Sequence, residues 1–207
     1  MALATWFAFA LASVVLLLIP GPTVLLVVSY AMTQGRKVAV AMAAGVALGD
    51  FTAMTLSLAG LGALLLTSAT LFTALKWIGA AYLVYLGVRL WRAKPVLPDV
   101  VDDRRGRSAA GVFLHACVVT ALNPKSIAFF VAFVPQFIDR TAPVLPQFAI
   151  VEATFVALAA VNALVYAFAA DKLRGRIRRP GVLAWMNRAG ATCLVGMGVA
   201  TAALGRS

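Results

Sequence analysis

Three charged side chains stand alone inside apolar stretches of the sequence. Asp50, Lys125 and Glu152 are each the single charged residue in a run of at least 30 residues. A charge near the centre of a bilayer costs about 3 kcal/mol or more, and such a residue by default marks a substrate path or a proton relay. We therefore predict that all three bind substrate and that Asp50 and Glu152 also carry protons. The alternatives are a buried structural ion pair or, for the acids, a protonated and hydrogen-bonded carboxyl group.

Two proline-containing segments interrupt apolar stretches that otherwise resemble helices. They are Pro20-Gly21-Pro22 and Asn123-Pro124-Lys125. Proline removes a backbone donor and clashes with the preceding turn, so each segment should end one helix and begin another. Pro22 and Pro124 suit the first helical position, with the preceding residue as the cap. Each new N-terminus presents free N–H groups that favour an anion, so we predict both segments at the substrate site. The alternative is a simple proline kink.

The acids and the breaks lie at matching depths. Asp50 and Pro22 are each 13 or 14 residues from the basic pair Arg36-Lys37, which is about 20 Å along a helix. Lys125 and Glu152 flank a turn in the second half at the same spacing. We expect each break to face an acid across a helical hairpin.

Composition defines what kind of protein must position these residues. The AVILMFWYC set makes up 63% of 207 residues, charged residues make up 12%, and the mean hydropathy is +0.96. A soluble domain could not bury this much apolar surface, which excludes a soluble enzyme, a disordered chain and a collagen-like fibre. The apolar runs are too long and too uniform for the alternating strands of a β-barrel.

Six apolar stretches are long enough to cross a bilayer as helices. They are Leu3–Met32, Val38–Leu66, Thr70–Leu90, Gly111–Phe137, Val144–Ala170 and Leu183–Leu204. The first has no basic residue before it and is too long for a cleaved signal peptide, so we interpret it as a retained helix. The predicted fold is all-α and integral to the membrane, with six transmembrane helices and interruptions in the first and fourth.

The basic residues predict the orientation. Fourteen of the 18 fall in loops on one side, and cytoplasmic loops are enriched in lysine and arginine. This places residues 93–110 in the cytoplasm as a linker and both termini in the periplasm. The same distribution explains the net charge of +11, so we predict no nucleic-acid partner.

The sequence contains an internal repeat. Six residues of the third stretch recur 111 positions later in the sixth: Gly79-Ala80, Leu83-Val84 and Gly87-Val88 match Gly190-Ala191, Leu194-Val195 and Gly198-Val199. Pro22 and Asp50 match Pro124 and Glu152 at an offset of 102. Three helices per half give the halves opposite orientations, as in many secondary transporters. We predict one transmembrane domain over residues 1–207, with inverted repeats at 1–92 and 111–207.

The remaining candidate residues are weaker. Asn162 is a possible substrate ligand, and a structural hydrogen bond between helices is the alternative. His115 is the single histidine, so it cannot form a metal site alone. Cys117 and Cys193 lie at no motif spacing. We predict no metal and no cofactor.

Several motifs together resemble a known family. They are Pro20-Gly21-Pro22-Thr23, Gly45 with Gly49-Asp50, the run from Leu75 to Gly87, Asn123-Pro124-Lys125 with Phe129-Phe130, and Pro135-Gln136-Phe137. Their order over nearly the whole chain resembles the lysine exporter superfamily, in its homoserine/threonine-resistance branch. The resemblance implies a six-helix carrier of the bacterial inner membrane that exports amino acids or close derivatives, driven by the proton gradient. It does not identify the substrate.

Other functions fit the sequence less well. A metal-ion exporter would need clusters of His, Cys or acidic ligands, and a thiol–disulfide carrier would need one reactive cysteine in each half. A non-transporting scaffold is the third alternative. The expected partners are a small neutral or apolar amino acid, protons and the lipid bilayer. The oligomeric state, a homodimer included, is left open.

Overall fold

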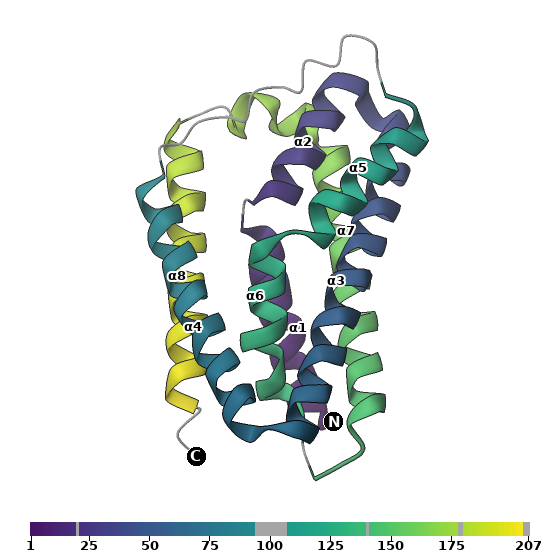
Figure 1. Cartoon of the computed structure of the whole chain (residues 1–207). Helices are drawn as coiled ribbons and strands as arrows, with labels where there is room; N and C mark the ends of the chain where they lie inside the picture. Colours follow the sequence, from purple (N-terminus) through teal and green to yellow (C-terminus); the bar gives the residue numbers. More distant parts are fainter. Residues whose placement is uncertain (20, 94–106, 140, 178–179, 205–207) are drawn as a thin grey trace.

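The computed structural model describes residues 1–19, 21–93, 107–139, 141–177 and 180–204. Within these ranges the protein is helical and has no strand (Figure 1). The α-helices are α1 (Leu3–Leu18), α2 (Pro22–Gln34), α3 (Ala39–Thr67), α4 (Ala69–Arg92), α5 (Ala109–Ala121), α6 (Pro124–Ala132), α7 (Val144–Ile177) and α8 (Pro180–Leu204). Two 3-10 helices, η1 (Gly35–Val38) and η2 (Val134–Phe137), follow α2 and α6. The predicted all-helical architecture is confirmed.

Each predicted apolar stretch corresponds to one long helix or to a pair of shorter ones. The pairs α1–α2 and α5–α6 cover the first and fourth stretches, and α3, α4, α7 and α8 cover the others. The main difference is at the end of α7, which continues past Ala170 to Ile177. Lysine and arginine end an apolar run but are good helix formers, so the helix outlasts the membrane-like segment.

Two helices are each long and apolar enough to cross a membrane within the described ranges. These are α3 over Ala39–Ala63 and α7 over Val144–Ala169. Each of the pairs α1–α2 and α5–α6 meets the same criterion if it counts as one bent span. The molecule is therefore a multi-pass membrane protein by length and composition.

The chain leaves the helical conformation at both predicted breaks. After α1, Ile19 is extended, α2 begins at Pro22, and the two axes differ by 56°. After α5, Asn123 is extended, α6 begins at Pro124, and the axes differ by 45°. Proline occupies the first helical position in both cases, where its missing N–H costs nothing.

Two glycines bring α3 against α5. A Cβ atom on Gly45 would lie 2.3 Å from the carbonyl oxygen of Phe113, and one on Gly49 would lie 2.6 Å from that of Cys117. No side chain fits in these spaces, so the two backbones are in direct contact, as in other small-xxx-small pairs of membrane helices. Asp50 follows Gly49 directly, and the contact therefore holds it close to the end of α5, where the chain breaks.

The glycines of the internal repeat join α4 to α8 in a reciprocal contact. A Cβ on Gly87 would meet the side chain of Val195 and the carbonyl of Ala191, at 2.7 Å and 2.9 Å. A Cβ on Gly198 would meet the equivalent atoms of Val84 and Ala80, at 2.6 Å and 2.7 Å. Each contact maps onto the other through the offset of 111. In Figure 1 this pair stands beside the remaining helices as a separate layer.

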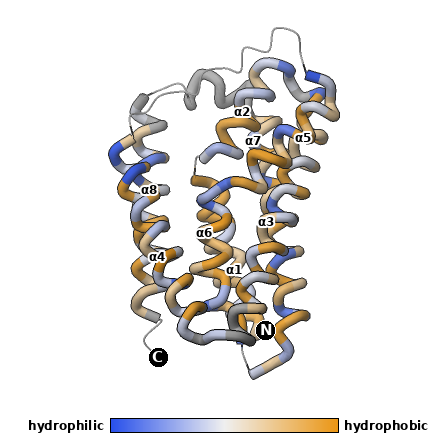
Figure 2. The backbone as a smooth tube through the Cα atoms, viewed as in Figure 1, coloured by the Kyte–Doolittle hydropathy of each residue, from blue (hydrophilic) through white to orange (hydrophobic). Residues whose placement is uncertain are grey.

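The ends of the molecule differ in polarity. The start of α1 and the end of α8 lie at the same end (Figure 1). The opposite end carries the last turn of α4, with Arg89 and Arg92, and the hydropathy colouring shows hydrophilic residues there on both α4 and α8 (Figure 2).

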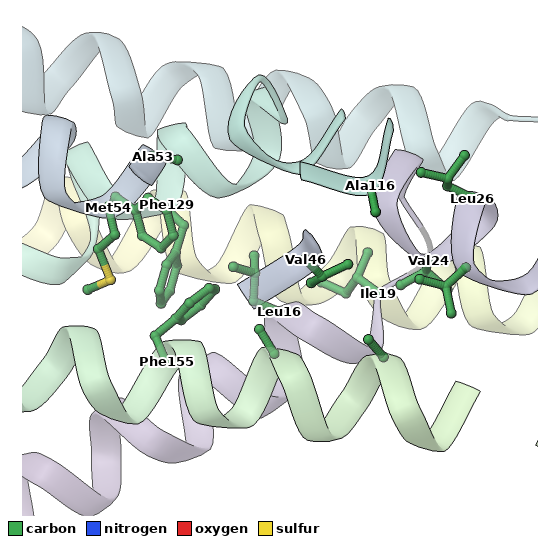
Figure 3. Close-up of a cluster of buried hydrophobic side chains, with 14 of the residues drawn as sticks. Leu16, Ile19, Val24, Leu26, Val46, Ala53, Met54, Ala116, Phe129 and Phe155 are labelled. Carbon is green, nitrogen blue, oxygen red and sulfur yellow. The ribbon is translucent and has the colours of Figure 1, made fainter. Parts of the chain in front are cut away.

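A cluster of phenylalanines fills the core between the breaks and the end of the molecule where the N-terminus lies. Its members, here called the aromatic cluster, are Phe9, Phe129, Phe130, Phe133, Phe137 and Phe155. Phe129 and Phe155 have ring centroids 5.9 Å apart and are fully buried. Figure 3 shows both rings to one side of Leu16, Val46 and Val24, which lie next to the first break.

Candidate functional site

The two helix breaks border a central cavity. Its polar lining consists of Thr23, Asp50, Asn123, Lys125, Ser126, Asn162 and Tyr166, and the rest of the wall is aliphatic. The cavity volume is about 20 Å³, measured as the space open to the centre of a water molecule. About one water fits in such a space, and an amino acid does not.

Asp50 is the buried acid of this cavity. Its side chain is 2% exposed, and its Oδ1 atom has no hydrogen-bond partner. Ser126 lies beside the carboxyl group, and the Lys125 side chain lines the same cavity. Buried polar atoms are nearly always hydrogen-bonded, so this carboxylate oxygen is a candidate acceptor for a bound group.

Lys125 closes the end of α1. Its Nζ atom donates hydrogen bonds of 2.9 Å to the carbonyl oxygens of Leu16 and Ile19. The last carbonyls of a helix have no partner within the helix and carry the negative end of its dipole, which suits an ammonium group. Gly21 leaves room for this arrangement, because a Cβ there would come within 3.4 Å of Nζ and Cε.

Two side chains of α7 donate hydrogen bonds to the carbonyl oxygens of Leu17 and Leu18, the residues between Leu16 and Ile19. Asn162 Nδ2 donates to the carbonyl oxygen of Leu17 at 3.3 Å, and the Tyr166 hydroxyl donates to that of Leu18 at 3.3 Å. The four final carbonyl oxygens of the first half-span are therefore held by donors from α6 and α7. In this conformation Asn162 makes a bond between helices and also lines the cavity.

The two half-helix N-termini are not equivalent. The N-terminus of α6 is capped, because Asn123 Oδ1 accepts a hydrogen bond of 3.1 Å from the Lys125 backbone N–H. The N-terminus of α2 has Gly21 as its cap and no side-chain hydrogen bond. The N–H groups of Thr23 and Val24 therefore have no partner within the helix, and both residues line the cavity. Asn123 Nδ2 also donates to Thr23 Oγ1 at 3.2 Å, which links the breaks.

The structure brings together some of the predicted site residues. Asp50, Asn123, Lys125 and Asn162 line the central cavity. Gly21, Pro22 and Pro124 line a second cavity on the other side of Lys125, of about 330 Å³ on the same measure. Pro20 lies outside the described residues.

Glu152 lies apart from this cavity. It accepts a hydrogen bond from the Thr55 hydroxyl of α3. Along α7 it precedes Phe155, which in turn precedes the cavity residue Ala159. The aromatic cluster thus separates Glu152 from Asp50, and the two acids do not share one site.

Three polar cavity residues were absent from the predicted site. Tyr166 is one helical turn after Asn162, so their shared face was a usable signal. Ser126 follows Lys125 directly and faces Asp50. Thr23 contacts Thr120 across the breaks, with 3.3 Å between the hydroxyl oxygens. Serine and threonine are common in apolar helices, so no sequence pattern marks these two.

The cavity lies between two contacts in the core. Toward the end of the molecule where the N-terminus lies, it is followed by the aromatic cluster. In the opposite direction the buried Tyr30 hydroxyl lies 2.8 Å from His115 Nδ1, where α2 meets α5.

The described residues give no support to a metal centre or a dithiol. No group of three His, Cys, Asp or Glu side chains in the described ranges could hold a metal ion. Cys117 of α5 and Cys193 of α8 are free thiols.

The chain matches a known protein family. The model of the LysE type translocator matches residues 14–205, which is nearly the whole chain. The chain belongs to this family. The resemblance inferred from the sequence motifs is thereby confirmed, and the protein is a transporter and not an enzyme.

Named relatives point to amino-acid efflux. A protein of Salmonella typhimurium named homoserine/homoserine lactone efflux protein is 35% identical over 184 residues, 89% of each chain. A leucine efflux protein of Salmonella choleraesuis is 33% identical over 138 residues, 67% of this chain and 65% of that one. An uncharacterized membrane protein of Vibrio cholerae is 35% identical over 94% of each chain. No solved structure matches the translocator.

Proposed function

We propose that this translocator is a secondary transporter that exports an amino acid across the bacterial inner membrane in exchange for protons. The observation that carries the proposal is the orphaned Oδ1 atom of Asp50, buried in a cavity beside Lys125 and an uncapped helix N-terminus. An amino acid at neutral pH is a zwitterion, and this cavity offers an acceptor for its ammonium group and donors for its carboxylate.

The carboxylate would bind at the start of α2. The backbone N–H groups of Thr23 and Val24 are free within the helix, and the dipole of α2 favours an anion there. Lys125 Nζ uses two of its three hydrogens on α1 carbonyls, so one donor remains for the substrate. Asn123 would support this site from α6 by holding Thr23.

The ammonium group would bind to Asp50. Its Oδ1 would accept from the substrate, and Asp50 would take up a proton when the substrate leaves. Since a buried carboxylate oxygen without a hydrogen-bond partner is costly, substrate and proton would alternate at Oδ1. Glu152, with Thr55, would be the second acid of the proton path on the far side of the aromatic cluster.

The substrate side chain would be small and neutral or apolar. The rest of the cavity wall is formed by Leu16, Leu17, Val24, Val27, Val46, Ala159 and Ala163. These groups offer no partner for a second charge. Because the cavity holds about one water, the breaks must separate before a substrate enters, and the present conformation is closed.

We also propose a six-span inverted repeat with both termini in the periplasm. The reciprocal contacts of Gly87 and Gly198 support the repeat, and the common end of the two termini supports an even number of spans. The arginines at the opposite end of α4 support its cytoplasmic location.

The decisive experiment measures export from liposomes that contain the purified protein. Vesicles loaded with a panel of radiolabelled amino acids are placed in a medium that imposes a pH gradient. The expected result is gradient-dependent efflux of small neutral or apolar amino acids by the wild type, and none by Asp50→Asn. Wild-type vesicles that release no amino acid, or Asp50→Asn vesicles with the wild-type rate and pH dependence, would contradict the proposal.

A further inference from the structure

The second cavity, here called the vestibule, lies between α4 and the two breaks. Its α4 wall consists of Tyr82, Leu86, Arg89, Leu90 and Ala93, spaced as one face of a helix. Its other wall includes Pro22, Pro124 and Lys125. With about 330 Å³ open to the centre of a water molecule, it is much larger than the central cavity.

The vestibule borders the exposed side of both breaks. Pro22 and Pro124 line it, and both residues are exposed. The carbonyl oxygens at the end of α1 are held by donors from α6 and α7, so protein satisfies that part of the first break. Within a bilayer, interrupted backbone is tolerated where protein buries it or where it lines a water-filled space. The exposed prolines are therefore the part of the breaks that a water-filled space would accommodate.

The charge of the vestibule favours an anion. Arg89 and Lys125 line it, and none of its described lining residues is acidic. The guanidinium carbon of Arg89 lies 5.9 Å from the centre of the Tyr85 ring, which supports the side chain from the neighbouring turn. Arg89 lies in the basic last turn of α4, and Lys125 lies at the opposite wall of the vestibule, so the two cations define a path toward the central cavity.

Lys125 belongs to both spaces. It lines the vestibule on one side and the central cavity on the other. An anion that enters the vestibule from the Arg89 end therefore reaches Lys125 before it reaches the N–H groups of Thr23 and Val24, because these two residues line the central cavity and not the vestibule.

We propose that the vestibule is the cytoplasmic entry subsite of the translocator and that Arg89 binds the substrate carboxylate there before Lys125 receives it. The inference rests on the proposed amino-acid export and adds a second carboxylate site to it. The vestibule would bind the substrate by its carboxylate alone. The central cavity would then bind both the carboxylate and the ammonium group.

The first test compares an acid with its amide. Arg89→Gln and the control Arg92→Gln are reconstituted, and efflux of leucine and of leucinamide is measured against their internal concentration. Arg92 is on the same helix but lines a different surface. Loss of a charge-assisted hydrogen bond should raise the half-saturating concentration of leucine about tenfold in Arg89→Gln. Leucinamide has no carboxylate, so the wild type should export it poorly and Arg89→Gln should export it no worse than the wild type does. Arg92→Gln should resemble the wild type for both compounds.

The outcomes separate the entry site from the proposed function. If wild type exports leucine and Arg89→Gln does so with the same half-saturating concentration, the entry site is refuted and export stands. An equal loss for leucine and leucinamide would also refute it, because the effect would not depend on the carboxylate.

The second test needs no known substrate. In a background with Cys117→Ala and Cys193→Ala, Leu86→Cys places a thiol in the vestibule, and Val88→Cys places one on another face of α4. An anionic methanethiosulfonate reagent should label position 86 faster than a cationic one, and Arg89→Gln should abolish this preference. Position 88 should show no such preference. Absence of labelling at position 86 would show that the space is dry or filled by lipid and would overturn the proposal.

Discussion

Lys125 Nζ lies 2.9 Å from the carbonyl oxygen of Ile19, although the two residues are 106 positions apart. The ammonium group that follows the second break thus closes the helix that ends at the first. One side chain both ties the two halves together and forms part of the wall of the central cavity. A motion that opens the cavity between the breaks therefore has to lengthen or break this contact.

Removal of the Lys125 charge should destabilise the fold. Lys125→Met leaves Leu16 and Ile19 carbonyls without their donor and Asp50 without its nearest positive charge, and uncompensated buried charges cost about 3 kcal/mol or more. Unfolding in mixed micelles measures the change. The double variant Lys125→Met with Asp50→Asn should recover part of the loss, since no charge is then left alone. Lys76→Met serves as the control, and equal stability of Lys125→Met and this control would disprove the capping role.

The cap of α6 should matter for both stability and binding. Asn123→Ala removes the acceptor for the Lys125 N–H and the donor to Thr23, at about 1–2 kcal/mol. We expect a similar loss in amino-acid affinity, about tenfold, measured by equilibrium binding to the purified protein. Asn123→Asp keeps the cap oxygen and loses the Thr23 donor, so it should retain part of the stability. An unchanged affinity in Asn123→Ala would separate this cap from the substrate site.

Neutralising Asp50 and neutralising Glu152 should have different effects on binding and on export. Asp50→Asn should abolish both binding and gradient-driven export, because Asp50 lies in the cavity. Glu152→Gln should keep binding but weaken the dependence of export on the pH gradient, because Glu152 lies beyond the aromatic cluster. Counterflow, which needs no gradient, distinguishes the two variants. Normal pH dependence in Glu152→Gln would remove Glu152 from the proton path.

The contact between α4 and α8 offers a matched pair of glycines. Gly198→Ala would place a Cβ 2.6 Å from Val84 and 2.7 Å from the Ala80 carbonyl, so the helices must separate, at about 1–3 kcal/mol. Gly196→Ala meets nothing within 4 Å and should be neutral or slightly stabilising. The melting temperatures of the two variants in detergent test this directly. Equal melting temperatures would mean that this contact adds little to stability.

Membrane topology can be tested with single cysteines at the starts of α4 and α5. In a background without native cysteines, Ala110→Cys lies at the start of α5 and Thr70→Cys at the start of α4, at opposite ends of the molecule in Figure 1. An impermeant thiol reagent added to intact cells should label position 70 and spare position 110. The reverse pattern would invert the proposed orientation.

The sequence predicts the position of the breaks well, because proline acts locally. Pro22 and Pro124 begin helices wherever the rest of the chain lies. The sequence also predicts that Asp50 lies level with a break, since the rise per residue of a helix is fixed, and the structure places Asp50 in one cavity with Thr23 and Asn123. The effect of proline explains where the half-helices α2 and α6, which border the central cavity, begin.

The partners of the site residues were not predictable in this way. Lys125 was expected to bind substrate, and in this conformation its ammonium holds the end of α1. Glu152 was expected to face the second break, and it contacts Thr55 instead. Both outcomes depend on how α7 and α6 are placed against the first half. That placement is decided by close packing, such as the contact of Gly49 with α5, and no periodicity encodes it.

The size of the central cavity has a consequence for the cell. A space for about one water molecule, bounded by aromatic rings on one side, cannot hold a continuous chain of hydrogen-bonded waters. Protons cross proteins by hopping along such chains, so the central cavity in this conformation offers them no continuous path. Under the proposed exchange, protons would cross the membrane only in the cycles that also export an amino acid, and idle copies would not drain the membrane voltage.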